Sequence, residues 1–425
     1  MTKKRISVWF LISAVLVTAT LTFMLTVLYG GSLVGAEDAV ATVTESAAEE
    51  ETEEKQLSAA EINQKLVAKI TELMAYYNKY YVGELDVDAL IQGVAEGLVA
   101  YSGDKYGSYH TVEEYKALIS DYGGEFAGIG VTVTYNTDYF AIEILSVMNN
   151  SPALSAGLQP DDLIIAVDGV DVAYLGYNEA VNCIRGEVGT AVTLTIARGE
   201  GYKERFDVSI TRQTVEEQTV TYDEIISEDI IQPIGYVRIS SFDDKTPAQF
   251  KEAMGEGLTN NVHGFIIDLR NNGGGTLNSV VSMLDMILPE GPIVRIQYKS
   301  GEETVYKSDA YGISSRVPII ILVNGNTASA AELFTSALRD YGRAIIVGET
   351  TYGKGTVQSI IRLSDGSGLR LSTALYAPPY SDNFEGVGIT PDITVSLADE
   401  YKSVNLYKLD YENDAQLKAA VNLYK

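Results

Sequence analysis

The stretch that decides the fold is Ile319–Ile320–Ile321–Leu322–Val323–Asn324–Gly325–Asn326–Thr327–Ala328–Ser329–Ala330–Ala331–Glu332–Leu333. Its uninterrupted apolar run predicts a strand buried on both faces, and the Asn and Gly residues after it predict a turn. Apolar residues then recur at helical spacing, so a helix should begin at Ser329. A serine in that position is most often an N-cap, but its hydroxyl can also serve as a nucleophile. Position alone leaves both interpretations open.

A lysine follows within the segment Gly353–Lys354–Gly355–Thr356–Val357–Gln358. A hydroxyl with a nearby amine that can lose its proton suffices for acyl transfer without histidine, and this chain has only two histidines. A basic lysine needs a buried, apolar site, and a surface lysine in a loop is the alternative. If a strand follows, alternation would place Lys354 and Gln358 on one face, where Gln358 could hold the amine by a hydrogen bond.

The same lysine also ends a partial match to a nucleotide-binding loop. Residues 348–354 match the first seven positions of a Walker A motif. That motif next requires Ser or Thr and a helix, whereas Gly355 stands there and residues 356–363 are rich in β-forming types. A nucleotide site is therefore disfavoured.

A glycine-rich segment, Asn271–Asn272–Gly273–Gly274–Gly275, closes another predicted strand. Such glycines can serve a tight turn only, or they can offer bare N–H groups to an anion. Beside a serine nucleophile, the second use would complete an oxyanion hole together with the N–H of Ala330, the residue after Ser329.

Composition excludes several classes of protein. A chain of 425 residues can form two or three domains, and a net charge of −27 argues against binding to a nucleic-acid backbone. The single cysteine, Cys183, excludes an internal disulfide framework and is expected as a small buried hydrophobe in a helix. His110 and His263 are isolated, so neither a metal site nor a cofactor is implied.

The N-terminus predicts an attachment to the membrane. Lys3, Lys4 and Arg5 precede an uncharged stretch, residues 6–29, that is long enough to cross a bilayer as a helix. The positive residues should stay cytoplasmic, which places the rest of the chain outside. A cleaved signal peptide is the alternative, because Val34–Gly35–Ala36 resembles a cleavage site. We favour an uncleaved single-pass anchor in the cell membrane, with the catalytic part extracytoplasmic.

Changes in composition divide the chain into six parts. Residues 1–30 are the cytoplasmic stub and anchor, and residues 31–56 are an acidic linker. Residues 57–118 should be helical, starting with a Ser58–Glu61 capping box, and could pack on the body or form a dimer arm. Short strands with Gly and Asp turns fill 119–213, among them residues 129–133 and, as the last strand, residues 192–198. Alternating strands and helices in 214–398 predict an α/β core, and 399–425 a C-terminal helical tail.

The strand-rich part resembles a known binding module. The motifs are Gly128–Ile129–Gly130–Val131, Ser151–Pro152–Ala153, Ala156–Gly157–Leu158 and Gly169–Val170. Together they resemble a PDZ domain of the circularly permuted bacterial kind. Such domains bind a peptide C-terminus by strand addition, so the resemblance implies that Gly128, Ile129 and Gly130 cradle the carboxylate of an apolar tail.

Four blocks of the chain resemble the carboxy-terminal processing protease family: residues 268–275, 324–332 and 353–358, and Gly386–Val387–Gly388–Ile389–Thr390–Pro391–Asp392. The resemblance implies a crotonase-like, ClpP-like α/β protease core with an inserted PDZ domain. It also implies roles for individual residues: Ser329 as nucleophile, Lys354 as general base, Gln358 as the residue orienting the lysine, and the N–H groups of Ala330 and Gly274 as the oxyanion hole, with Gly275 as the neighbouring candidate.

Two positions add detail to this resemblance. Gly273 stands where the family often has proline, a departure that leaves the donors in place. Arg185 falls where members carry an arginine at the junction of PDZ domain and protease, which suggests that it couples the two.

The expected function is therefore that of a membrane-anchored serine endopeptidase that cleaves proteins outside the cytoplasm. Its PDZ domain would recognise apolar C-terminal tails of protein substrates. A homodimer and a regulatory partner are compatible with this expectation. The alternatives are a catalytically silent scaffold that binds tails, and a protease active only with a partner.

Overall fold

The computed structural model describes residues 57–226, 230–309, 317–402 and 404–425. The predicted anchor (1–30) and acidic linker (31–56) lie outside these residues. None of the described helices combines the length and the apolar character that a membrane span requires. The chain divides into two compact units, residues 1–84 and residues 85–425.

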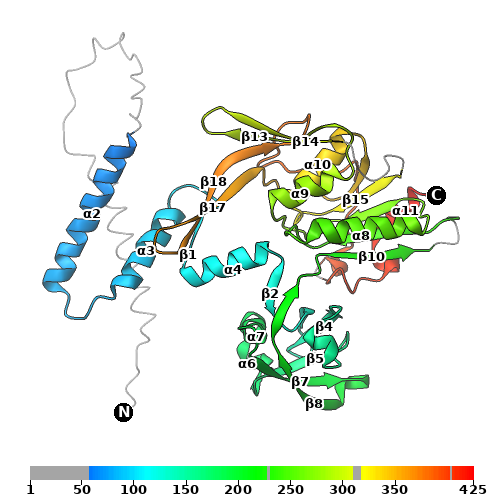
Figure 1. Cartoon of the computed structure of the whole chain (residues 1–425), viewed down its shortest axis with the longest axis horizontal. Helices are drawn as coiled ribbons and strands as arrows, with labels where there is room; N and C mark the ends of the chain where they lie inside the picture. Colours follow the sequence, from blue (N-terminus) through cyan, green and yellow to red (C-terminus); the bar gives the residue numbers. More distant parts are fainter. Residues whose placement is uncertain (1–56, 227–229, 310–316, 403) are drawn as a thin grey trace, which may run out of the picture. The chain divides into compact units, whose positions relative to one another are not determined.

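The first unit contributes one described helix, α2 (Ala59–Tyr80), labelled in Figure 1. Ser58 is its N-cap, and the Ser58 backbone N–H donates to Glu61 Oε2 at 2.9 Å. This confirms the predicted capping box. The apolar side chains of the helix are exposed, including Ile62, Leu66 and Leu73.

The second unit contains a six-stranded α/β sheet with the strand order β10-β11-β12-β15-β16-β19. All neighbouring pairs are parallel except β10 with β11. The strands are β10 (Val220–Ile225), β11 (Ile234–Ile239), β12 (Phe265–Asp268), β15 (Ile319–Val323), β16 (Ala344–Gly348) and β19 (Ile393–Thr394). The predicted α/β alternation is therefore present, and the bounds of β15 are those expected from its apolar run.

Helices cover both faces of this sheet. One face packs on α8 (Thr246–Thr259), α9 (Leu277–Asp285) and α10 (Ala330–Asp340) through a core that includes Phe250, Phe334 and Ile321. The alternate residues of the same strands pack on α11 (Ala415–Asn422), as Leu322 and Val421 do. Burial on both faces explains why β15 is apolar at every position.

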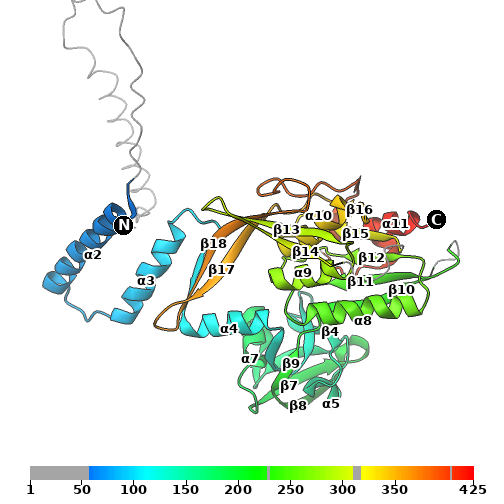
Figure 2. The same cartoon turned by 45° about the horizontal axis from the view of Figure 1, so that its top comes forward.

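A second, antiparallel sheet carries the lysine segment. Its strands are β1 (Ser108–His110), β13 (Gly291–Tyr298), β14 (Glu303–Ser308), β17 (Thr356–Arg362) and β18 (Gly368–Ala377). Figure 2 shows β17 and β18 running side by side; α3 (Val87–Ala100) contacts β1, and α4 (Val112–Tyr122) contacts β18, which is far from it in sequence. Because a strand and not a helix begins at Thr356, the Walker A alternative is wrong.

The PDZ region forms its own sheet, and Figure 1 shows it as a lobe joined to the core through β2 (Glu125–Gly128). The strand order is β3-β4-β5-β7-β8, with β6 paired to β5. The elements are β3 (Val131–Asn136), β4 (Ala141–Val147), α5 (Pro152–Ser155), β5 (Leu163–Val167), β6 (Val170–Asp171), α6 (Val172–Leu175), α7 (Tyr177–Ile184), β7 (Ala191–Arg198), η1 (Glu200–Tyr202), β8 (Glu204–Thr211) and β9 (Gln213–Glu216), the last paired with β2.

Two sequence expectations for this lobe need correction. The predicted strand 129–133 is interrupted at Gly130, whose φ of 80° ends one strand before the next begins. The run 192–198 is not the last strand, because β8 follows it. Cys183 lies on α7, half-buried against the lobe's apolar core.

The C-terminal part contains less helix than expected. Among its described residues, 399–402 and 404–425, α11 is the only α-helix, and two short 3-10 turns precede it, η2 (Asp399–Tyr401) and η3 (Tyr411–Asn413).

Candidate active site

Ser329 occupies a strained turn between β15 and α10. Its φ of 58° and ψ of −120° lie in a region that residues with side chains rarely adopt. The turn is tied to the neighbouring strand end, since Thr327 Oγ1 donates to the Leu269 carbonyl at 2.8 Å and the Ala328 N–H donates to the Asn272 carbonyl at 2.9 Å. Ser329 is thus both the N-cap residue of α10 and a hydroxyl held in a fixed, unusual geometry.

A buried carboxylate, Glu332, joins this turn to the lysine segment. Its Oε2 accepts from the backbone N–H of Ser329 at 2.8 Å and of Lys354 at 2.9 Å. Its Oε1 accepts from the Gly353 N–H at 2.7 Å and from Thr351 Oγ1 at 2.5 Å. Glu332 is fully buried, and these four donors compensate its charge. One side chain therefore positions the backbone of both Ser329 and Lys354.

Lys354 is partly buried beside Ser329 and lines the same cavity. Burial, and then the positive charge of Arg370, lower the pKa of the Lys354 amine, against the opposing effects of Glu385 and Glu332. Its Nζ lies 4.8 Å from the centre of the Tyr106 ring. This environment makes the neutral, basic form of the amine easier to reach than in a solvent-exposed lysine.

Gln358 lines the cavity as well, but its contacts differ from the expectation. Its Nε2 donates to Thr356 Oγ1 at 2.8 Å and lies 3.5 Å from Ser372 Oγ. Strand β17 begins after Lys354 and has a bulge between Val357 and Gln358, so simple alternation does not relate the two side chains. Among the described residues no hydrogen bond joins Gln358 to Lys354, and the orienting role remains a prediction.

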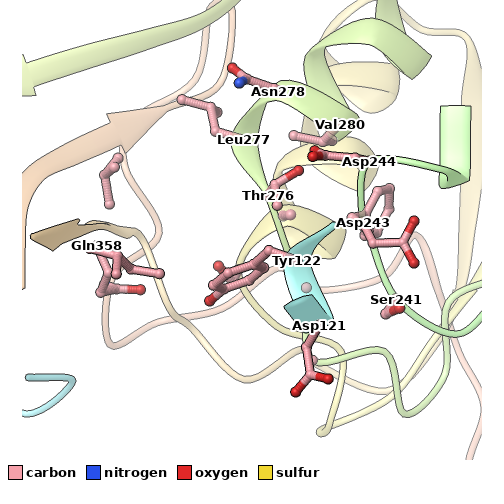
Figure 3. A pocket seen from close by; sticks show the side chains of 18 of the residues that line it. Asp121, Tyr122, Ser241, Asp243, Asp244, Thr276, Leu277, Asn278, Val280 and Gln358 are labelled. Carbon is pink, nitrogen blue, oxygen red and sulfur yellow. The ribbon is translucent and has the colours of Figure 1, made fainter. Parts of the chain in front are cut away.

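The cavity that these residues share has a volume of about 880 Å³. Ser329, Ala330, Gly274, Lys354, Gln358 and Tyr376 all line it. Figure 3 shows Gln358 on one side of the cavity, and Thr276, Asp243 and Asp244 on the other. The cavity is continuous with the junction to the PDZ lobe, since Arg185 and Glu217 also line it.

The glycine loop lies directly against the serine. A Cβ on Gly274 would stand 2.7 Å from the Ser329 Cβ and 2.9 Å from the Ala330 nitrogen. The Gly274 N–H, however, donates to Asn272 Oδ1 at 2.8 Å, within its own loop. Within the described part of the chain, the N–H groups of Ala330 and Gly275 have no acceptor. Ala330 therefore offers a free donor beside the serine, while that of Gly274 is engaged in this conformation.

Tyr376 is a site residue that the sequence did not suggest. It is buried, lines the cavity, and donates from its hydroxyl to the Lys354 carbonyl at 2.5 Å. Burial raises the pKa of Tyr376 well above its usual range, with a smaller opposing effect from a hydrogen bond to the Ser329 side chain. Tyr376 thus contacts the lysine segment and lines the same cavity as the serine.

Three residues that contact or surround Ser329 and Lys354 were missed from sequence: Glu332, Arg370 and Tyr376. A signal existed for Glu332, because Ser329 and Glu332 have the spacing of a capping box. Arg370 and Tyr376 reach the cavity from β18, where Arg370 pairs with β17 and Tyr376 with β13, and no local pattern predicts these pairings.

A buried ionic network anchors the strand end that carries the glycine loop. Asp268 accepts from Arg270 at 2.7 Å and from Arg238 at 3.1 Å, and Arg270 also pairs with Asp414 at 2.8 Å. Although burial raises the pKa of Asp268, the charges of Arg270 and Arg238 hold it well below its usual range. The loop therefore begins from a rigid base.

The PDZ lobe has a separate groove of about 340 Å³. It lies along β3, an edge strand, and is lined by apolar side chains that include Ile129, Val133, Val181 and Ile184. All three predicted cradle residues, Gly128, Ile129 and Gly130, line it. An open strand edge beside an apolar groove is the arrangement that strand addition of a peptide requires.

Arg185 lies between the two hollows and lines both. Its Nη1 is 3.8 Å from Asp121 Oδ1, and its guanidinium lies 5.3 Å from the centre of the Phe126 ring. The predicted position at the domain junction therefore agrees with the structure.

Comparisons with known proteins agree with this geometry. Residues 233–395 match the model of Peptidase family S41, and residues 143–198 match that of the PDZ domain. A carboxy-terminal-processing protease of Bartonella bacilliformis is 34% identical over 349 residues, which are 80% of this chain and 78% of that protein. A probable CtpA-like serine protease of Staphylococcus epidermidis is 33% identical over 341 residues, 80% of this chain and 67% of the relative.

A solved structure shares the fold. The putative S41 protease from Bacteroides fragilis has a TM-score of 0.55 and 17% identity, and the match covers 81% of this chain and 92% of the other. The family models, the relatives and the fold lead to one assignment: the chain belongs to the carboxy-terminal-processing protease family of S41 serine peptidases and carries a PDZ domain.

Proposed function

We propose that this protein is a membrane-anchored, extracytoplasmic endopeptidase that cuts proteins with Ser329 as nucleophile and Lys354 as general base. One observation carries the proposal. Ser329, in a strained turn, shares a cavity with a lysine of lowered pKa, and Glu332 bonds to the backbone of both. The anchor and the location rest on the apolar residues 6–29 and the positive charges before them.

The reaction begins with neutral Lys354, whose Nζ takes the proton from Ser329 Oγ as that oxygen attacks a peptide carbonyl carbon. The Ala330 N–H, with a donor from the glycine loop, stabilises the negative oxygen of the tetrahedral intermediate. The intermediate collapses as the protonated lysine gives its proton to the leaving amine. Water then attacks the Ser329 ester with Lys354 again as base, and the acid product and the free serine are released.

The PDZ lobe would select substrates by their C-terminal tails. Its apolar groove and the open edge of β3 fit an extended apolar segment, and backbone N–H groups around Gly128–Gly130 would take the terminal carboxylate. The parallel sheet flanked by helices supports a crotonase-like, ClpP-like core for the protease part. A homodimer through the exposed apolar faces of the N-terminal helices remains part of the proposal.

A second candidate is a protease that becomes active only when a tail or a partner binds. The observation that favours it is the bond from the Gly274 N–H to Asn272 Oδ1, which withdraws a predicted oxyanion donor. Turning that peptide group towards the cavity, or using Gly275 instead, would complete the hole. A silent scaffold is less well supported, because Ser329, Lys354 and Gln358 are all present at the cavity.

The test is cleavage of an unfolded protein by the detergent-solubilised full chain, with Ser329→Ala and Lys354→Arg beside the wild type. Both variants should lose at least about 1,000-fold in rate while keeping the fold, because alanine has no nucleophile and a guanidinium cannot act as base at neutral pH. Ser300→Ala and Lys299→Arg, at exposed positions, are matched controls that should cleave normally.

The outcomes separate the candidates. Cleavage that survives in Lys354→Arg would remove the lysine as base, and cleavage that survives in Ser329→Ala would remove the serine. A wild type that is silent alone and active after addition of a tail peptide would establish the second candidate. A wild-type protein that cleaves nothing with or without tail peptides would support the alternative of a catalytically inactive scaffold that binds tails.

A further inference from the structure

The tail-binding groove is not made by the PDZ lobe alone. Four of the residues that line it, Glu217, Gln218, Ser240 and Tyr407, belong to the protease core and to the segment after it. Tyr407 is the largest of them, and 49% of its surface is exposed. An aromatic ring that faces an open apolar groove is available to a ligand in that groove.

The position of Tyr407 is well defined by its own segment. The Tyr407 N–H donates to Asn405 Oδ1 at 3.0 Å, and the Lys408 N–H donates to the Asn405 carbonyl at 2.8 Å, so residues 405–408 form a tight turn. The guanidinium of Arg238 lies 4.4 Å from the centre of the Tyr407 ring. Arg238 is itself held by Asp268 at the base of the glycine loop. The ring is therefore fixed against the core.

The next residue connects the same turn to the PDZ lobe. Lys408 Nζ forms an ion pair with Glu143 Oε1 on β4. The Glu143 side chain is only 5% exposed, whereas that of Lys408 is 37% exposed. Glu143 also accepts from Asn136 Nδ2 at 2.9 Å. Because a buried carboxylate that loses its partner is strongly disfavoured, this pair holds lobe and segment together.

We propose that residues 405–408 complete the tail-binding site. Tyr407 packs against the apolar side chains of a bound peptide C-terminus, and Lys408, paired with Glu143, holds the PDZ lobe where that contact is made. The ligand is a peptide with a free carboxylate and apolar last residues, bound along β3. This inference rests on the proposed tail recognition and adds a binding wall that the PDZ domain does not encode.

The first experiment measures peptide binding to the full chain carrying Ser329→Ala, which prevents cleavage. The probe is a fluorescein-labelled peptide ending in Val-Ala-Ala, in free-acid and amidated forms, followed by anisotropy. Tyr407→Ala should weaken binding of the acid form about 5- to 20-fold, the effect of losing one aromatic contact. Tyr407→Phe should bind like the parent. Tyr411→Ala, on the same segment and outside the groove, is the matched control and should bind normally.

The ion pair is tested by a double-mutant cycle. Lys408→Met and Glu143→Gln should each weaken binding about tenfold or less, and the double variant should weaken it by less than the product of the two, because both disrupt one contact. Lys402→Met, on the same tail, is the charge control. Multiplicative effects of the two changes would overturn the role of the pair.

Amide hydrogen exchange gives a readout that needs no groove variant. Addition of the acid peptide to the parent should slow exchange at Tyr407 and Lys408 together with β3. Protection of β3 without residues 407–408, or unchanged binding by Tyr407→Ala, would overturn the inference while leaving tail recognition intact. Equal binding of acid and amide, or binding of neither, by the parent would instead overturn the proposed tail recognition and this inference with it.

Discussion

The nucleophile turn and the tail-binding groove are stabilised in different ways. Around Ser329, one buried carboxylate receives four donors, and the glycine loop begins at a strand end held by two arginines. Around the groove, lobe and core meet through the side chains of Arg185 and Lys408, which are 48% and 37% exposed. The difference indicates that the positions of Ser329 and Lys354 are preorganised, whereas recognition can adjust to different tails.

The largest effect in this comparison is expected from Glu332→Gln on the rigid side. An amide in place of the carboxylate loses the charge and opposes one of the N–H donors. We expect kcat to fall about 100-fold with KM little changed, since misplacement of the reacting groups has effects of that order. The free energy of unfolding should fall by about 2–4 kcal/mol. Kinetics and thermal melts measure the two.

The control for that change is Glu302→Gln, at an exposed turn. Equal loss of kcat and tail-peptide affinity in Glu332→Gln would contradict the separation of the two regions.

A smaller effect is expected from Arg370→Gln, and it appears in the pH profile. Activity requires neutral Lys354, so the rate should rise with pH through the pKa of that amine. The charge of Arg370 helps to lower this pKa, and its removal should therefore move the rising limb to higher pH and slow the enzyme several-fold at pH 7. Rates measured from pH 5 to 10 test this, with exposed Arg362→Gln as the control. A limb that stays in place would argue against Lys354 as the titrating base.

Asn272→Ala tests whether the glycine loop beside the nucleophile turn limits the resting enzyme, because it releases the Gly274 N–H from its acceptor. We expect the basal rate to rise about 2- to 5-fold relative to the rate with tail peptide, a small change in barrier height. The free energy of unfolding should fall by about 1–3 kcal/mol, because the Ile239 carbonyl also loses a donor. If the ratio of stimulated to basal rate is unchanged, the withdrawn donor is not what limits the resting enzyme.

The smallest effect is expected from Arg185→Gln. The distance between Arg185 and Asp121 is long, and both side chains are about half exposed. The free energy of unfolding should therefore change by less than about 1 kcal/mol. Activation by a tail peptide should nevertheless require a higher peptide concentration, because Arg185 lines both hollows. Dose–response curves measure this, with Arg205→Gln on β8 as the control. An unchanged curve would exclude Arg185 from coupling.

The part of the fold that could be predicted from sequence is the part governed by local patterns. The apolar run 319–323 gave the bounds of β15, and the capping box at Ser58 gave the start of α2. Strands β8, β13, β14 and β18 were not predicted, because their burial alternates irregularly and their partners are distant in the chain.

The site divides in the same manner. Ser329, Lys354, Gln358, Ala330 and Gly274 were named from short motifs, and all of them line one cavity. The motifs do not show which acceptor each N–H donor of the site bonds to. The Gly274 N–H turns to Asn272, and the Gln358 amide turns to Thr356, because nearby acceptors compete for donors that a motif treats as free.

The network behind the glycine loop also sets an order for biosynthesis. Arg270 is buried against Asp414, which follows it 144 positions later, and Asp104 receives the Ser372 hydroxyl across 268 positions. During synthesis from the N-terminus, the PDZ lobe can fold as a unit before either partner exists. The ribosome must therefore add Asp414 before the network behind the loop beside Ser329 is complete, so the nascent chain passes most of its synthesis with an unfinished catalytic centre.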